Sequence, residues 1–348
     1  MSAQSPKPFR IGIFRALQLG DLLCSIPAMR ALRQAYPAAR IELIGLPGAR
    51  ELAGRFPHYI DGFVDFPGYP GLPEQTPDAA RFRQFVSEKR DPPYDLLLQM
   101  QGNGNIVNDM LQQLAPTRLA GFCQAAALQN ENFLFYPADI HETERHLSLM
   151  VHLGIAAKDP DMEFNVTAAD RRHLTTLALP LVKPYICVHP GSRGVWRQWP
   201  PVYFGAMADL CISNGFKVVL TGTKGEHSIA EEVAGHMRGQ AFNACGLTDL
   251  GTLAALLEGA AGLLCNCTGI SHLAAALRVP SVVISMDGEP GRWGPRNTEL
   301  HETIDWTTGP GIIRVHAAMG RLFDRAGQVP RPPFQDEEAA AVPGITNR

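Results

Sequence analysis

The chain has 348 residues, of which 45% are apolar and 19% are charged, and its formal net charge is −3. This length exceeds that of most single cores and predicts two domains, each with enough apolar residues to bury a core. The 31 basic and 34 acidic residues nearly balance, which excludes a general electrostatic attraction to nucleic acid. We therefore expect no nucleic-acid partner.

Cysteine usage and hydropathy indicate the compartment. The seven cysteines lack the spacing of a metal site, and an odd count without a secretory leader is typical of reduced thiols in the cytoplasm. The first ten residues lack the apolar segment of a signal peptide, and no run reaches the roughly 18–20 apolar residues that cross a bilayer. We expect a cytoplasmic protein with no metal, no cofactor and at most peripheral membrane contact.

Strand-like and helix-like runs alternate through the first half of the chain. We predict strands over 11–17, 40–46, 62–67 and 94–100, and helices from Asp21, near 49–56, over 106–114 and over 142–153. A Pro- and Gly-rich stretch at 66–77 is predicted to be an exposed loop. This alternation predicts a parallel sheet of βαβ units in a first domain spanning 1–165.

The alternation restarts after a proline-marked linker at 180–184. Strands are predicted over 185–190, 216–222, 261–266 and 281–286, with helices between them. We assign 180–315 to a second domain of the same type, facing the first across a cleft. The helix at 316–328 is predicted to pack back towards the first domain, and 329–348 to form a mobile tail.

Asp21 stands directly behind Gly20 where the first predicted strand meets the first predicted helix. Two roles are open from the residues alone. Aspartate is a preferred helix N-cap, and Gly-Asp is common in turns. Such a junction also lies at the carboxyl edge of a parallel sheet, where ligands bind.

The loop HPGSRGVWRQWP at 189–200 follows the first strand of the second domain. Its glycines and Ser192 would let backbone amides approach an anion, and Arg193 and Arg197 supply positive charge. The alternative is a solvated turn with its tryptophans packed beneath it. The spacing of a Walker loop is absent.

Two further loops join strands to helices in the second domain. Thr268 and Gly269 open a helix whose amides suit a phosphate, and His272 lies in its first turn, where a purely structural histidine is the alternative. Glu226 could accept hydrogen bonds from ribose hydroxyls or serve as an ordinary first-turn carboxylate. Because these loops meet at one sheet edge, they predict a nucleoside diphosphate as ligand.

Several other patterns predict little chemistry. His141, His146 and His152 lack the spacing of a helical zinc pair and are interpreted as surface residues. The G-x-G-x-x-G fingerprint is absent after the first strand, and QGNGN at 101–105 does not replace it, which argues against an NAD enzyme.

The order of several motifs resembles a known family. These are LQLGD before a helix with Pro27, LQMQGNGNIVN followed by RLAGF, HPGSRGVWRQWP, TGTKGE, and NCTGISHLAAALRVPSVVI followed by RWGP. Over roughly residues 10–325 the chain resembles the bacterial ADP-heptose:lipopolysaccharide heptosyltransferases of glycosyltransferase family 9. The resemblance implies a GT-B fold of two Rossmann-like α/β domains and an inverting, metal-independent sugar transfer.

The resemblance also implies roles for individual residues. Asp21 would be the general base acting on the acceptor hydroxyl. Ser192 and Arg197 would contact the diphosphate, Arg197 standing where the family usually has lysine, while Glu226 would contact the ribose and Leu247 border the adenine. Thr268, Gly269 and His272 match the family's phosphate motif. Together with the candidates from the residues themselves, the full set of substrate- or donor-binding candidates is Gly20, Ser192, Arg193, Arg197, Glu226, Leu247, Thr268, Gly269 and His272.

One residue departs from the family pattern. The family usually reads D-T-G at the last motif, where this chain has Cys267-Thr268-Gly269, and a thiol accepts hydrogen bonds poorly. The implied partners are a nucleotide-sugar donor and a glycan or glycolipid acceptor, with peripheral contact at the inner face of the cytoplasmic membrane. A transferase with another nucleotide sugar or a soluble acceptor, and a non-catalytic sugar-nucleotide or glycan-binding protein, are the alternatives.

Overall fold

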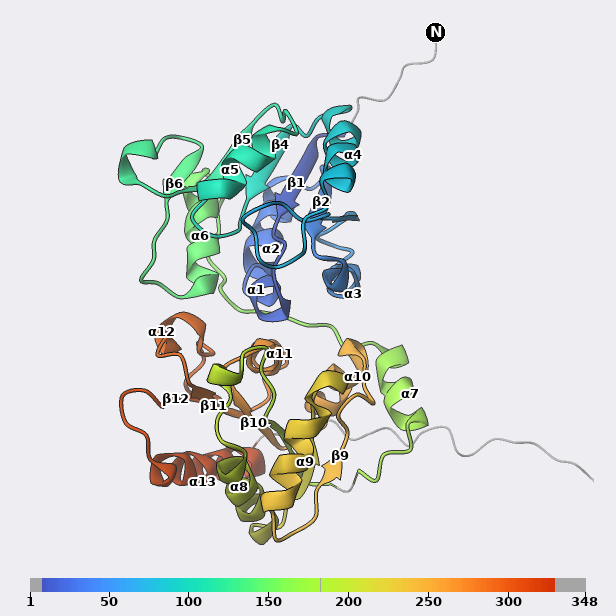
Figure 1. Cartoon of the computed structure of the whole chain (residues 1–348), viewed down its shortest axis with the longest axis vertical. Coiled ribbons are helices and arrows are strands. Elements are labelled where there is room, and N and C mark those ends of the chain that lie inside the picture. The colour runs from blue at the N-terminus through green and yellow to red at the C-terminus, as the bar shows by residue number, and fades with distance from the viewer. Residues whose placement is uncertain (1–7, 182, 329–348) are drawn as a thin grey trace, which may run out of the picture.

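The computed structural model describes residues 8–181 and 183–328, which form two α/β domains stacked along the long axis of the molecule (Figure 1). Each domain contains a six-stranded parallel sheet. The predicted fold class, two Rossmann-like parallel-sheet domains, is confirmed.

The first sheet has the strand order β3-β2-β1-β4-β5-β6. Its strands are β1 (Arg10–Phe14), β2 (Arg40–Gly45), β3 (Gly62–Asp65), β4 (Leu96–Gln99), β5 (Leu119–Cys123) and β6 (Phe133–Phe135). Its helices are α1 (Leu19–Leu23), α2 (Ile26–Ala35), α3 (Arg50–Gly54), α4 (Ala79–Arg90), α5 (Asn105–Gln112) and α6 (Glu142–His152). Apolar side chains of β1, β2 and β4 are buried on both faces, as expected for a sheet covered by helices on both sides.

The second sheet has the order β12-β11-β10-β7-β8-β9. Its strands are β7 (Tyr185–His189), β8 (Lys217–Leu220), β9 (Phe242–Asn243), β10 (Gly262–Asn266), β11 (Ser281–Ser285) and β12 (His301–Asp305). The helices that follow the first domain are α7 (Ala168–Thr176), α8 (Pro201–Ser213), α9 (His227–His236), α10 (Leu250–Glu258), α11 (Gly269–Ala276), α12 (Pro290–Trp293) and α13 (Ile312–Gln328). Short 3-10 turns, including η3 (Val195–Arg197), lie in the loops.

The first predicted helix is in fact two helices. It begins at Leu19, before Asp21, and is interrupted at Cys24 and Ser25 before α2. Pro27 explains the interruption, because it has no N–H to donate to the carbonyl of Leu23 and its ring would clash there. Asp21 is therefore the third residue of α1, and the residue at the N-cap position is Gln18.

The prediction for the C-terminal helix is wrong. Helix α13 begins at Ile312 and packs on the second sheet, where Val315, Met319 and Leu322 join the core formed by β7, β10 and β11. The apolar face of a strongly amphipathic helix is buried most fully by the nearest sheet, which here belongs to its own domain. The predicted tail at 329–348 lies outside the described residues.

Helix α7 precedes the second sheet in sequence and packs against α10. Arg171 forms a two-pronged ion pair with Glu258 of α10, with its Nη2 2.7 Å from Oε1. On the other side, Arg55, the C-cap residue of α3, donates to Asp170, with Nη1 2.7 Å from Oδ2. The segment that links the two sheets is thus attached to both domains.

All seven cysteines are buried and form no disulfide. In the described ranges, no helix combines the length and apolar character needed to cross a membrane. The same ranges contain no group of three His, Cys, Asp or Glu side chains arranged to hold a metal ion.

Candidate functional site

Each sheet has one point where the strand order reverses, and the site residues follow these strands. In the first sheet the reversal lies between β1 and β4, and in the second between β7 and β10. At such a point the connections leave to opposite sides and open a crevice at the carboxyl edge of the sheet. The two edges face each other, because α1 after β1 packs against α11 after β10 (Figure 1).

Asp21 lies at the crevice of the first sheet beside a buried arginine. Its Oδ1 lies 3.7 Å from Nη2 of Arg15, and its backbone carbonyl accepts from Nε of Arg15 at 2.7 Å. The Arg15 side chain is fully buried, whereas 24% of the Asp21 side chain is exposed. Burial raises the pKa of Asp21, Arg15 opposes this shift, and the nearby charge of Glu142 adds to it. A carboxylate with a raised pKa is a stronger base when it is ionised.

Glu142 is the centre of a buried charge cluster that joins the domains. It lies 3.2 Å from Nη2 of Arg15 and pairs with Arg145 within the first domain. From the second domain, Nε of Arg292 approaches its Oε2 at 3.3 Å. His146 lies one turn further along α6, with Nε2 3.3 Å from Glu142 Oε1. One carboxylate thus holds together the arginine beside Asp21 and the arginine from the opposite domain.

The titration of this cluster follows from its contacts. Burial by itself would raise the pKa of Glu142, but the close approach of His146 and the charges of Arg15 and Arg145 hold it far below its usual range. Burial and the nearby Arg15 lower the pKa of His146 to about 4. Because His141 and His146 are buried, their interpretation as surface residues is wrong.

His141 also forms a hydrogen bond across the domain boundary. Its Nδ1 accepts from the backbone N–H of Thr143, so the proton is on Nε2, which donates to the carbonyl of Gly294 at 2.9 Å. The pKa of His141 is lowered, chiefly by burial. The ring therefore caps α6 and ties that helix to the segment after α12.

A pocket of about 350 Å³ opens beside Asp21. Its lining includes Glu142, Arg292 and Tyr136, together with residues 101–107 after β4 and Leu72 and Glu74 of the loop at 66–77. The loop predicted to be merely exposed therefore contributes to the pocket. Oε2 of Glu74 is buried without a hydrogen-bond partner in the described part of the chain. Amides and carboxylates around a half-open space can accept and donate hydrogen bonds to the hydroxyls of a sugar.

The loop after β7 brings Ser192 and Arg197 to the crevice of the second sheet. The buried Oγ of Ser192 has no partner among the described residues, and a bound anion would satisfy it. Arg197 pairs with Asp287 and also donates to the carbonyl of Cys267. Arg193 is exposed. Of the two tryptophans in this loop, Trp199 is buried and Trp196 is 76% exposed, so the alternative of a turn with both tryptophans packed beneath it fits only Trp199.

Glu226 acts as a first-turn carboxylate, one of the two roles predicted for it. Its Oε2 accepts from both the backbone N–H and the hydroxyl of Thr223 at 2.8 Å, closing a capping box. The same carboxylate lies against Gly191, where any side chain would collide with it. Leu247 is about half exposed beyond the end of β9. Both residues lie on loops after β8 and β9, on one side of the crevice, and their contacts with a nucleotide stay predictions.

Gly20, Gly269 and His272 lie where the two domains touch. A Cβ on Gly20 would come 2.7 Å from Cδ2 of His272 and 3.3 Å from Cα of Gly269. The His272 ring is buried, its Nδ1 lies 3.5 Å from Sγ of Cys24, and burial lowers its pKa to about 4. These contacts support the structural role for His272. Thr268 precedes α11 at the N-cap without capping it through its side chain.

We expect Gly20→Ala to destabilise the contact between α1 and α11. The added methyl group must displace His272, and overpacking of this kind typically costs about 1–3 kcal/mol. Thermal unfolding should show a lower Tm than wild type. Gly54→Ala in α3 is the matched control, because nothing lies within 4 Å of its new Cβ; equal effects of the two substitutions would refute the close contact.

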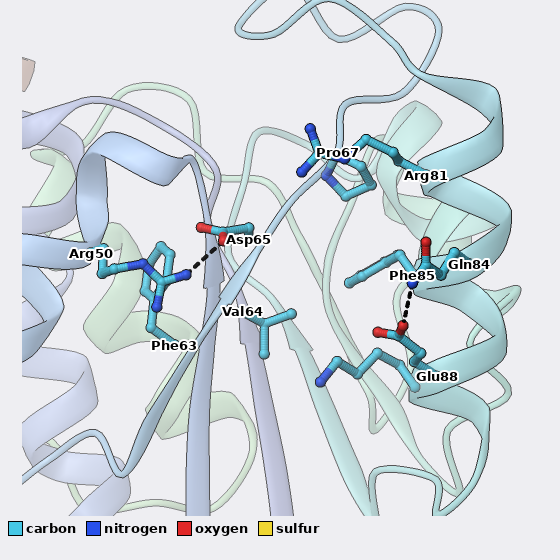
Figure 2. A pocket seen from close by; sticks show the side chains of 10 residues that line it. Arg50, Phe63, Val64, Asp65, Pro67, Arg81, Gln84, Phe85 and Glu88 are labelled. Carbon is cyan, nitrogen blue, oxygen red and sulfur yellow. Dashed lines mark hydrogen bonds and ion pairs between the residues drawn. The ribbon is translucent and has the colours of Figure 1, made fainter.

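A second pocket of about 310 Å³ lies at the edge strand β3, between α3 and α4 (Figure 2). Arg50 points to Asp65 across the strand, with Nη2 2.6 Å from Oδ2, and Gln84 donates to Glu88 at 2.8 Å. This second pocket shares no lining residue with the pocket beside Asp21. Because this pocket lies at the outer edge of the first sheet, away from the loops that follow β1, β7 and β10, we place the functional site at the facing crevices instead.

Comparisons with known proteins show the family of this chain. The family model described as glycosyltransferase family 9 (heptosyltransferase) matches residues 82–308. The chain is 31% identical to lipooligosaccharide heptosyltransferase 2 of Haemophilus ducreyi over 298 residues, which cover 78% of this chain and 80% of that protein. The chain belongs to glycosyltransferase family 9. It is therefore a glycosyltransferase, and the predicted resemblance is confirmed.

Solved structures agree on the fold of this family 9 enzyme. The crystal structure of a family 9 glycosyl transferase from Veillonella parvula superimposes with a TM-score of 0.74 at 17% identity, covering 90% of this chain and 97% of that one. The structure of the E. coli ADP-heptose lipopolysaccharide heptosyltransferase II gives 0.73 at 20% identity, covering 91% and 99%. The GT-B arrangement is thus shared along most of both chains.

Several residues of the site were not among the candidates predicted from the sequence. Arg15 sits inside a predicted buried strand, which is itself a signal, because a buried arginine needs a partner. Asp287 follows a predicted strand end, as the other candidates do. Glu142 and Arg292 gave no local signal, since their pairing joins residues 150 positions apart.

Proposed function

We propose that this enzyme transfers a heptose from ADP-heptose to a lipopolysaccharide-core or related glycan acceptor, with inversion at the anomeric carbon and with Asp21 as general base. The observation that carries the proposal is the Asp21 carboxylate, partly exposed, raised in pKa and set in a pocket that Arg292 of the opposite domain helps to line. Membership of family 9 and the named activities of the curated relatives support the choice of heptose and acceptor.

In the proposed reaction the acceptor sugar occupies the pocket of the first domain and the nucleotide sugar binds along the loops of the second. The acceptor hydroxyl attacks the anomeric carbon, the bond from that carbon to the diphosphate oxygen breaks, and the hydroxyl proton passes to Asp21. A single displacement of this kind inverts the anomeric centre. General-base assistance typically contributes about 10²- to 10⁴-fold to the rate.

The leaving diphosphate needs positive charge and N–H donors. Arg197 supplies a permanent charge, the unpartnered Ser192 hydroxyl a hydrogen bond, and the amides that open α11 the positive end of a helix dipole. No step of this scheme uses a metal ion. A lipid-anchored acceptor would bring the enzyme to the inner face of the cytoplasmic membrane as a peripheral protein.

A thermal-shift screen of nucleoside diphosphates and their sugars tests the proposal. We expect ADP and ADP-heptose to raise Tm, because a ligand at 100 times its Kd adds about 2.7 kcal/mol to the free energy of unfolding. UDP and GDP at the same concentrations should leave Tm unchanged. Stabilisation by UDP or GDP alone would mean that the donor is a sugar of that nucleotide and not ADP-heptose. No stabilisation by any of them would contradict the proposed function.

We expect Arg197→Ala to weaken ADP binding about 10- to 100-fold, because hydrogen bonds to charged groups contribute about 1.5–3 kcal/mol each. Titration calorimetry with ADP measures the change. The control is Arg321→Ala on α13, which removes an arginine paired with Glu302 on the surface of the same domain. An unchanged ADP affinity in Arg197→Ala would remove this residue from the donor site.

A further inference from the structure

Asp287, the ion-pair partner of Arg197, lies at the donor crevice. It stands two residues beyond the end of β11, and Cys267 directly follows the neighbouring strand β10. The two strands are parallel, and the backbone N–H of Cys267 donates to the carbonyl of Ile284 at 2.8 Å. The residues therefore emerge side by side at the same edge of the sheet.

Arg197 links these two strand ends through one atom. Its Nη2 lies 2.6 Å from Oδ2 of Asp287 and donates to the carbonyl of Cys267 at 3.3 Å. The hydroxyl of Ser285 donates to the other carboxylate oxygen, Oδ1, at 2.9 Å. The Asp287 side chain is thus held in place from two sides, and 20% of it is exposed.

The thiol of Cys267 cannot accept hydrogen bonds as a carboxylate does. Burial and the charge of Asp287 raise the pKa of Cys267 to about 12, so the thiol stays protonated at neutral pH. Its Sγ lies 3.6 Å from the carbonyl of Trp293, to which it is a weak donor. Asp287 is therefore the carboxylate beside Arg197 at these strand ends, and position 267 offers only a protonated thiol.

We propose that Asp287 binds the sugar of the nucleotide-sugar donor, accepting hydrogen bonds from its hydroxyls, and so supplies the carboxylate that Cys267 does not. A carboxylate has about four acceptor positions, of which Arg197 and Ser285 use two. The remaining positions lie beside the arginine that would hold the diphosphate, where the donor sugar begins. This inference rests on the proposed function, because it needs a nucleotide sugar at this edge.

The test compares the affinities of ADP and ADP-heptose for the full chain by titration calorimetry. Asp287→Asn should lower the affinity for ADP-heptose relative to that for ADP by tenfold or more, because charge-assisted hydrogen bonds to the sugar are lost. The double variant Asp287→Asn/Cys267→Asp should restore most of this ratio. The matched control is Glu302→Gln, which removes a carboxylate that is also 2.6 Å from an arginine of the same domain and should leave the ratio unchanged.

The comparison of ADP with ADP-heptose separates sugar recognition by Asp287 from a structural role. If Asp287 only orders Arg197, its loss changes the affinities for ADP and ADP-heptose by the same factor, and the inference is overturned. Unchanged affinities for both ligands overturn it too, as does a fall in the ratio that Cys267→Asp does not restore. If wild type binds neither ligand, the proposed function itself has failed, and this inference fails with it.

Discussion

Replacement of Asp21 by asparagine is expected to reduce sugar transfer by about 10²- to 10⁴-fold while ADP binding stays close to wild type, because the proton acceptor is lost and the donor loops are untouched. Turnover assays and calorimetry on the same preparation measure both quantities. The control is Asp109→Asn, which changes an exposed carboxylate on α5 of the same domain. Transfer near the wild-type rate in Asp21→Asn would remove this residue from the mechanism.

The raised pKa of Asp21 adds a pH dependence to this prediction. The rate should fall as pH drops through that pKa, at a higher pH than for an ordinary aspartate, because the protonated acid cannot accept the acceptor's proton. The native state holds this proton more tightly than the unfolded state does, so ionisation of Asp21 costs stability above its ordinary pKa. Asp21→Asn should therefore raise Tm at neutral pH, and a lowered Tm would contradict the assigned direction of the shift.

Glu142→Gln is expected to lower the free energy of unfolding by about 3–5 kcal/mol at neutral pH. The substitution removes the counter-charge of Arg15 and Arg145, whose side chains are fully buried, and an uncompensated buried charge is costly. It also removes the ion pair with Arg292 and so weakens the link between the domains. Urea unfolding gives the free energy, and the enzyme should lose activity together with stability.

The control for Glu142→Gln lies on the same helix. Glu144 is about half exposed and pairs with Arg296 of the other domain, so Glu144→Gln should cost at most about 1 kcal/mol. Because the pKa of Glu142 is lowered, its contribution is complete above the ordinary glutamate pKa and is lost as pH falls below it. The difference between Glu142→Gln and wild type should then shrink in acid; a difference independent of pH would contradict the ion-pair account.

The fold was predictable where the periodicity was strong. Buried apolar runs predicted β1, β2, β4, β7 and β11 within a few residues. The strands β5, β6, β9 and β12 were not predicted, because they are short, contain glycine or alternate with polar residues, and owe their conformation to neighbouring strands. The break before α2 could have been predicted from Pro27, since proline removes a helical hydrogen bond.

The candidate site was predictable only as far as strand ends reveal it. Ligands bind at the carboxyl ends of parallel strands, and this rule predicted Asp21, Ser192, Arg197 and Thr268 as candidates because they all follow strands. The same rule could not reveal that Glu142 and Arg292 meet, because that pair depends on how two domains dock. The close approach of Gly20 and Gly269 depends on the same docking and could not be predicted either, while their contacts with a substrate stay predictions.

The most direct measurement of the central claim is the configuration of the sugar product. Wild type, ADP-heptose and a lipopolysaccharide core acceptor should give ADP and a new glycosidic bond whose anomeric configuration, read by NMR, is opposite to that of the donor. A product of retained configuration would contradict a single displacement aided by Asp21. Donor and acceptor recovered unchanged, from a protein that binds both, would contradict the assignment of this pocket as a site of glycosyl transfer.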